Sequence, residues 1–248
     1  MTILISEVLR VRSMESNPEY DILLTFNETL GDTSSHLEIE AIPLVKHSEI
    51  SGKHFTTPCN LHGTRLTFDL AVTHATQSAR FATRRDVLLP EWLHGSGLGS
   101  YIFSKLIAWG HHVAPAATFK QLSLSAVDAQ TPIAKNRRNG FYRAHNFQLS
   151  FSQDPEERCG HCCSATLNTL KVRPVNNRKI LSITPVDKFL IAQLHQRYEM
   201  ERQVATQKKV MADWQTRFAV SQNKNQKLRF LAMVLLLALI ILLWHQRF

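Results

Sequence analysis

The stretch LPEWLHGSGLGSYIFSKL, residues 89–106, decides the predicted fold. It holds three of the chain's 9 glycines, at alternate positions, namely Gly95, Gly97 and Gly99. After Gly97 the apolar residues follow the period of a helix, which we expect Gly110 and Pro115 to end. Glycine lets the backbone approach a ligand with no Cβ in the way, and a helix N-terminus attracts anions. The stretch therefore predicts a phosphate-binding loop, although a Rossmann turn or a simple tight turn would give a similar pattern.

Strand patterns dominate the part of the chain before the loop. They are clearest in three stretches, YDILLTF (20–26), HLEIEAIPL (36–44) and TRLTFDLAV (64–72), and continue in RFATRRDVLL (80–89). After the loop, a second helix starts at Thr131–Pro132, because threonine caps helices and proline suits the first helical position. Three more strands are expected, at residues 120–127, 147–151 and 163–172. This order predicts an α/β (α+β) fold with a mixed, mostly antiparallel twisted sheet flanked by helices.

Net charge and cysteine content narrow the classes of function. The formal net charge is +9, but residues 1–183 hold 19 basic and 16 acidic side chains, whereas residues 184–248 hold 10 and 4. A nearly neutral globular part argues against nucleic-acid binding, and a basic C-terminal quarter suits an anionic membrane surface. The N-terminus lacks the order of a secretory signal, so we expect the 4 cysteines to be free thiols in a reducing compartment.

The segment FLAMVLLLALIILLW, residues 230–244, has no charged or strongly polar side chain. As a helix it would span about 22 Å, against about 30 Å for the hydrocarbon core of a bilayer. Arg229 and Arg247 at its ends could reach outward to the headgroups. A buried core helix or an oligomerisation helix is the alternative. Because more basic residues precede than follow it, we expect a transmembrane tail anchor at residues 229–246 and the rest of the chain in the cytoplasm.

A segment between the globular part and this anchor, residues 184–228, lacks proline and glycine after Pro185. Its apolar residues keep a loose seven-residue rhythm, which Arg197 and several polar residues interrupt. Two interpretations fit. One is a helical stalk that forms a weak coiled coil, so that the protein is a homo-oligomer. The other is an amphipathic helix that docks on the globular part.

Two motifs, in this order, resemble the GNAT superfamily of N-acetyltransferases. The first is the glycine loop HGSGLG at residues 94–99, and the second is FYRAHNF at residues 141–147. In that family the loop has the form Arg/Gln-x-x-Gly-x-Gly/Ala at a helix start, and the later motif has the form FY-x-x-x-GF. The resemblance covers residues 66–151. It implies a GNAT-like acyltransferase domain at residues 1–180 that uses acetyl-CoA as acyl donor and needs no metal.

Carried over to this chain, the resemblance implies roles for individual residues. Leu88 and Leu89 would pair through their backbone with the pantetheine arm, in the splay between two parallel strands. Tyr142 would protonate the leaving thiolate, because a phenol stays protonated at neutral pH. Backbone N–H groups of the loop would hold the pyrophosphate of coenzyme A, at His94, Gly95, Ser96, Gly97, Leu98, Gly99 and Ser100.

The chain departs from the family pattern in the spacing of Pro90, four residues before His94 where three is common, and at three further positions. His94 stands where arginine or glutamine is usual, and Lys135 stands where asparagine is frequent. Asn146 replaces the glycine of GF, a mild change because asparagine tolerates a left-handed backbone.

The base that would deprotonate the acceptor amine is less well specified. Glu38 and Glu40 lie on the polar face of one predicted strand and are the candidates, and Asp69 and Asp86 are further carboxylates nearby in the chain. Solvated strand carboxylates would give the same pattern.

Two other clusters have both a structural and a functional interpretation. CGHCC, residues 159–163, has a dithiol spacing and potential zinc ligands, but it lies in a polar loop without a second pair of ligands, which favours a plain thiol-rich loop. The cations of KNRRNGFYR, residues 135–143, favour a solvated face or, in the family context, a contact with the coenzyme's 3′-phosphate.

The sequence thus predicts a membrane-tethered N-acyltransferase that moves an acetyl group from acetyl-CoA to a primary amine by direct attack. The acceptor stays open, since a protein, small-molecule or lipid amine would fit. The alternative is a non-catalytic acyl-CoA-binding or membrane scaffold protein with the same fold, against which Tyr142 argues.

Overall fold

The computed structural model describes residues 2–13, 18–50, 53–59, 65–81, 89–151, 154–176 and 178–245. Side chains are not described at the ends of some elements, among them residues 237–245. The chain divides into two compact units, Met1–Phe189 and Leu190–Phe248.

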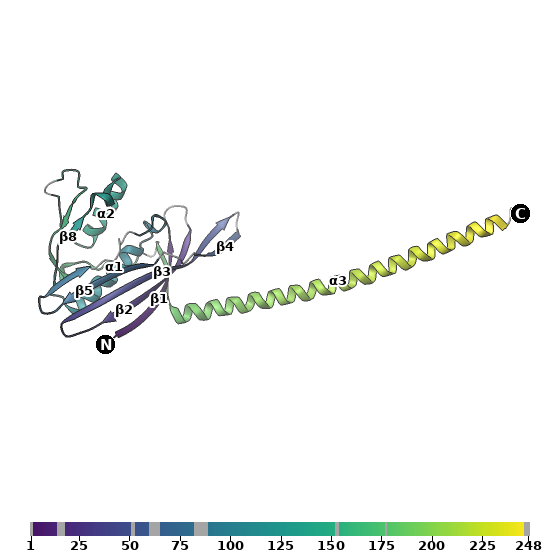
Figure 1. Ribbon diagram of the computed structural model, residues 1–248, viewed down its shortest axis with the longest axis horizontal. Coiled ribbons are helices and arrows are strands. Elements are labelled where there is room, and N and C mark those ends of the chain that lie inside the picture. The colour runs from purple at the N-terminus through teal and green to yellow at the C-terminus, as the bar shows by residue number, and fades with distance from the viewer. Residues whose placement is uncertain are drawn as a thin grey trace. The chain divides into compact units, whose positions relative to one another are not determined.

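The main sheet of the first unit contains nine of the described strands, in the order β11-β7-β6-β5-β3-β2-β1-β12, with β4 paired to β3 outside this path. All neighbours are antiparallel except β6 and β7, which are parallel. Figure 1 shows the long strands side by side. The bounds are β1 Thr2–Arg12, β2 Glu19–Thr29, β3 Ser34–Ile50, β4 Lys53–Pro58, β5 Leu66–Thr73, β6 Ser78–Phe81, β7 Thr118–Phe119, β11 Ala165–Thr166 and β12 Ile180–Pro185. The predicted mixed, mostly antiparallel sheet is confirmed.

Three helices and a small second sheet complete the described elements. The helices are α1 Leu98–Val113, α2 Pro132–Ala144 and α3 Val186–His245. The second sheet has the order β8-β10-β9, and α2 and β8 lie together in Figure 1. Its strands are β8 Leu122–Leu124, β9 Leu149–Ser150 and β10 Gly160–Cys162.

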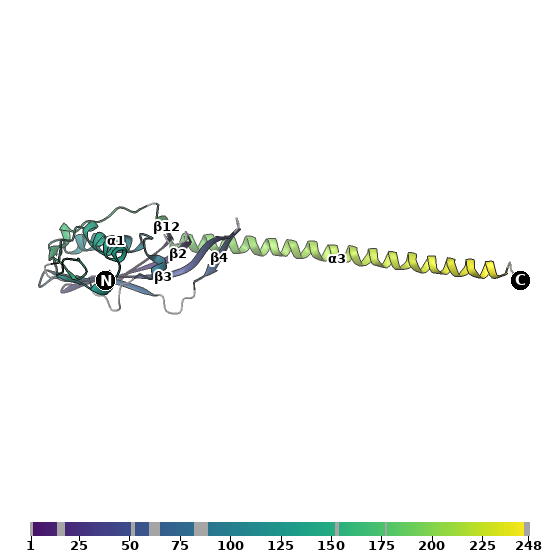
Figure 2. The same ribbon diagram turned by 90° about the horizontal axis from the view of Figure 1, so that it is seen from above.

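Side-chain alternation gives the main sheet an apolar and a polar face. Leu37 and Ile39 of β3 and Leu70 of β5 are buried on the apolar face, which α1 covers (Figure 2). Two hydrogen bonds fix α1 there. Tyr101 Oη donates to Glu7 Oε1 at 2.6 Å, and Trp109 Nε1 donates to Glu28 Oε1 at 2.7 Å. The residues that alternate with them in β3, among them Glu38 and Glu40, therefore lie on the opposite face.

Several predicted boundaries were wrong because tertiary pairing shortens the strands. The strand expected at residues 120–127 is only β8, which joins the second sheet. The strand expected at residues 163–172 is only β11, because a 3-10 turn at Leu167–Thr169 follows it. Strand β12 was not predicted, although it pairs with β1 along its length. Of the strand expected at residues 80–89, residues 82–88 lie outside the described part.

The sequence predicts that Gly110 ends α1, but the helix continues to Val113. The residue is buried in the helix, and a Cβ at Gly110 would lie 3.0 Å from Leu167 Cδ1 and 3.1 Å from Leu70 Cδ2. The glycine therefore allows α1 to approach β5 closely.

The second unit consists of α3 from Leu190 onward. Its apolar side chains at the seven-residue positions are exposed, among them Leu190, Val204, Met211 and Phe218. No helix within the described residues is both long enough and apolar enough to cross a membrane. Much of the expected anchor, residues 237–246, has side chains outside the described part.

Two helical glycines allow a matched test of this packing. A Cβ at Gly140 of α2 would meet nothing within 4 Å, so Gly140→Ala should stabilise the protein by about 0.5–1 kcal/mol through helix propensity. Gly110→Ala brings the same gain but overpacks the core, which typically costs about 1–3 kcal/mol, so it should be neutral or destabilising. Urea unfolding of both variants measures the difference, and a Gly110→Ala protein as stable as Gly140→Ala would contradict the packing described here.

Candidate functional site

Strands β6 and β7 lie in parallel for only a short distance. Ser78 pairs with Thr118, and Ala79 pairs with Phe119. The last hydrogen bond runs from Lys120 N to Ala79 O at 3.1 Å, after which the chain enters β8 of the other sheet. The two strands therefore part, and the edge of β6 beyond Ala79 is not paired with β7. This opening corresponds to the expected position of a pantetheine arm.

The glycine loop bends sharply just before α1. Gly95 and Gly97 have φ values of +72° and +83°, in the left-handed region that glycine adopts at little cost. Ser96 is buried, and its Oγ donates to Leu93 O at 2.7 Å and accepts from Leu98 N at 3.3 Å. Ser96 therefore shapes the loop through its side chain.

Some backbone N–H groups of the loop are already used. His94 N donates to Glu91 O at 2.9 Å, and Ser96 N donates to Leu93 O at 3.2 Å. In the described part of the chain, four others have no acceptor, those of Gly95, Gly97, Gly99 and Ser100. The first turn of α1 carries no acidic side chain and its N-cap residue makes no side-chain hydrogen bond. These N–H groups and the helix dipole together can bind an anion.

Packing against neighbouring side chains also explains why glycine is needed at two of these positions. A Cβ at Gly97 would lie 3.3 Å from Lys179 Cβ, and one at Gly99 would lie 3.1 Å from Leu89 Cδ1. The space that a Cβ would take is thus already occupied, so these glycines do not by themselves indicate a phosphate. The unpaired N–H groups carry the case for anion binding. Leu89 lies against Gly99, and Leu88 lies outside the described residues.

Tyr142 lies on α2, in an aromatic cluster that joins α2 to α1 and β6. Phe103 of α1 lies 5.0 Å from Phe141 and 6.4 Å from Tyr142, measured between ring centroids. Phe81 of β6 lies 4.5 Å from Phe103. The cluster therefore connects Tyr142 to the strand whose edge is open.

The phenol of Tyr142 is protonated at neutral pH. Burial raises its pKa above the ordinary value, and the neighbouring Cys162 and Asp128 raise it further. No described residue forms a hydrogen bond with its hydroxyl. A protonated donor free to bond a leaving group is what a general acid requires.

The end of α2 explains why asparagine is suited to position 146. Asn146 has a φ of +67°. Phe147 N donates to Tyr142 O at 3.1 Å, and Asn146 N donates to Arg143 O at 3.0 Å, the two bonds of a Schellman motif. The predicted tolerance of asparagine for this backbone is confirmed.

The predicted bases Glu38 and Glu40 lie on the sheet face opposite α1. Glu40 forms an ion pair with Arg65. Glu38 accepts from Asn27 Nδ2 at 3.5 Å and lies directly across from Asp69. Asp86 lies outside the described residues.

His36 is a residue of this face that sequence reasoning missed. Its Nε2 lies 3.2 Å from Asp69 Oδ2. The alternation of HLEIE already places His36 on the face of Glu38, but only the β3–β5 register brings Asp69 to it.

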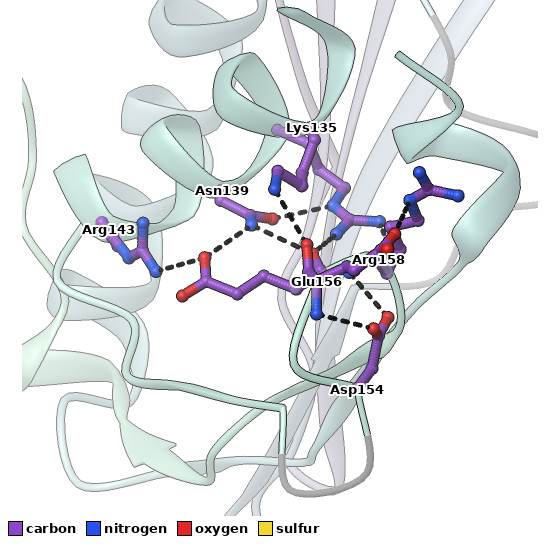
Figure 3. A network of polar contacts seen from close by, with 8 residues as sticks. Lys135, Asn139, Arg143, Asp154, Glu156 and Arg158 are labelled. Atoms are coloured by element: carbon purple, nitrogen blue, oxygen red, sulfur yellow. Dashed lines mark hydrogen bonds and ion pairs between the residues drawn. The ribbon is translucent and has the colours of Figure 1, made fainter. Parts of the chain in front are cut away.

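The basic cluster on α2 holds the loop at residues 154–158 (Figure 3). Lys135 Nζ donates to Glu156 O at 2.8 Å, and Arg143 Nη2 lies 3.0 Å from Glu157 Oε2. Asp154 completes the loop by accepting from backbone N–H groups that follow it, including that of Glu156 at 3.0 Å. These contacts favour the structural interpretation of the cluster over a contact with the 3′-phosphate.

The cysteine-rich loop has neither a reactive buried thiol nor a metal centre in the described part. All four cysteines are free. Cys162 is buried in β10, and burial raises its pKa to about 12. Among the described residues, no group of three or more histidine, cysteine or acidic side chains could hold a metal ion.

No family model matches the chain, and comparisons with curated proteins and with solved structures gave no match either.

The buried His145 should make stability depend on pH. It is 0% exposed, its Nδ1 donates to Lys171 O at 2.9 Å, and its Nε2 has no partner among the described residues. Burial lowers the pKa of His145, so the unfolded chain takes up this proton near pH 6.5 while the folded chain does not. The stability that the neutral ring contributes is complete above pH 6.5. As the pH decreases below 6.5, this contribution falls by up to about 1.4 kcal/mol per pH unit, until the pH passes the lowered pKa of the folded protein.

Urea unfolding of the wild type and His145→Gln between pH 7.5 and pH 5 measures this effect. The stability difference between the two proteins should decrease as the pH falls. A difference that stays constant over this range would show that His145 is not the titrating group.

Proposed function

We propose that the chain is a membrane-tethered, acyl-CoA-dependent N-acyltransferase of the GNAT type, which moves an acetyl group from acetyl-CoA to a primary amine. The observation that carries this proposal is the β6-α1-β7 unit. In it, two parallel strands part, and the connecting helix begins with a turn in which four backbone N–H groups lack an acceptor among the described residues. This combination supports a site for a linked pair of phosphates with an extended arm beside them.

Each part of acetyl-CoA has a counterpart in this arrangement. The pyrophosphate would accept hydrogen bonds from the N–H groups of Gly95, Gly97, Gly99 and Ser100. The pantetheine arm would lie along the open edge of β6, where unpaired backbone groups are available. The thioester sulfur would then approach Tyr142.

The reaction needs one bond to form and one to break. A neutral amine attacks the acetyl carbonyl, so that the C–N bond forms and the C–S bond breaks. The departing thiolate takes the proton of Tyr142. The nitrogen of the new amide then gives up one N–H proton, which returns to the phenolate. A half-buried phenol with a raised pKa suits this role, since it is fully protonated before each turnover.

Replacing Tyr142 by phenylalanine distinguishes the proposed enzyme from the alternative, a non-catalytic acyl-CoA-binding or scaffold protein. Tyr142→Phe should lower kcat by about 10²-fold or more, the usual range for general acid catalysis, and leave the Kd for acetyl-CoA unchanged. Tyr198→Phe, at an exposed tyrosine of α3, is the matched control. Thiol release in the presence of amines measures kcat, and calorimetry measures the Kd. Wild-type turnover by Tyr142→Phe would contradict the proposed acid.

Membrane attachment is proposed from residues 230–244 and the basic residues before them. Deleting residues 230–248 should move the protein from the membrane pellet to the supernatant, whereas the full chain should resist extraction at alkaline pH. Cell fractionation measures both. A truncated protein that still sediments with membranes would contradict a C-terminal anchor.

The exposed seven-residue positions of α3 also favour self-association of the stalk. Such pairing would bring two acyltransferase units to the same patch of membrane.

A further inference from the structure

A row of polar side chains crosses three strands on the sheet face opposite α1. Asn27 of β2 pairs with Glu38 of β3, and Glu38 pairs with Asp69 of β5. Residues directly opposite one another on neighbouring strands present their side chains to the same face, close enough to interact. The row therefore brings two carboxylates together.

Asp69 in this row is buried and only partly satisfied. Its side chain is 4% exposed. Oδ2 lies 3.2 Å from His36 Nε2, but Oδ1 has no hydrogen-bond partner within the described residues. Leaving a buried carboxylate oxygen without a donor is costly, so such an atom calls for a partner that the described residues do not supply.

The charges around the row favour a cationic partner. Arg65 is paired with Glu40, and Arg80, which lies across from Ala71, is exposed. Glu38 and Asp69 thus lie side by side, with His36 Nε2 3.2 Å from Asp69 Oδ2. Two neighbouring carboxylates, one with an oxygen that has no donor among the described residues, suit an ammonium group.

The row ends beside the strand proposed to hold the pantetheine arm. Leu70 pairs with Phe81, the last residue of β6, so Asp69 occupies the next register position beyond it. Neighbouring strands are about 4.8 Å apart. Asp69 therefore lies on the strand next to β6, one residue along β5 from the partner of Phe81.

We propose that Glu38 and Asp69 bind the ammonium group of the acceptor and that His36, held by Asp69, takes its proton. This inference rests on the proposed acyl transfer and narrows the acceptor to amines that are cationic at neutral pH. The ammonium gives one proton to His36, which passes it to solvent, and becomes the neutral amine that attacks the thioester. The carboxylates attract the charged form, and His36 generates the reactive one.

Binding of a simple cationic amine tests the site directly. The full chain in detergent, saturated with coenzyme A, is titrated with spermidine and with a lysine-containing peptide by calorimetry. Glu38→Gln and Asp69→Asn should each weaken the binding of these amines at least tenfold and leave the Kd for acetyl-CoA within twofold. Glu19→Gln, which removes a carboxylate from the exposed pair with Arg12, is the matched control and should change neither.

Acetyl transfer to the same amines tests the role of His36. His36→Gln should lower kcat about 10²-fold, with the KM for the amine nearly unchanged. If Asp69→Asn does not fold, the partly exposed Glu38 carries the binding test alone. A wild-type protein that takes up acetyl-CoA but neither amine, or a Glu38→Gln protein that binds them normally, would overturn the inference. A wild-type protein that takes up no acetyl-CoA would instead reject the proposed function.

Discussion

The parallel pairing of β6 with β7 is the constraint on which the rest of the site depends. Parallel neighbours cannot be joined by a tight turn, so the chain must cross over, and α1 is that crossover. The crossover places the first turn of α1 after the end of β6, where the N–H groups of Gly99 and Ser100 meet no acceptor from the described residues. Because β7 pairs no further than Lys120, the edge of β6 stays open beside that turn.

The two faces of the sheet carry different kinds of side chains. On one face, α1 and α2 meet through the aromatic cluster around Phe103, and Tyr142 lies there half-buried, with its pKa raised. On the other face, Glu38 and Asp69 lie side by side with His36. An acid that serves the leaving thiolate and a base that serves the incoming amine need opposite environments, one dry and one negatively charged. The proposed reaction would join the two at the opening between β6 and β7.

Local signals predicted the elements that local interactions determine. The change of period at Gly97 predicts the start of α1, and Thr131–Pro132 predicts the start of α2 with its side-chain cap. Features set by tertiary pairing were missed. Strand β12 is defined by its pairing with β1, and the contact between His36 and Asp69 requires the register of β3 with β5. The packing of Gly99 against Leu89 likewise cannot be inferred from spacing, which is why the glycines alone favoured a phosphate.

Hydrogen–deuterium exchange at the glycine loop tests the central claim most directly. In the free protein, the N–H groups of Gly97, Gly99 and Ser100 lack acceptors and should exchange rapidly. Saturating acetyl-CoA should slow their exchange by about tenfold or more, because the pyrophosphate would accept their hydrogen bonds. Unchanged exchange at these three residues, under conditions where acetyl-CoA is bound, would contradict a phosphate-binding loop at the start of α1.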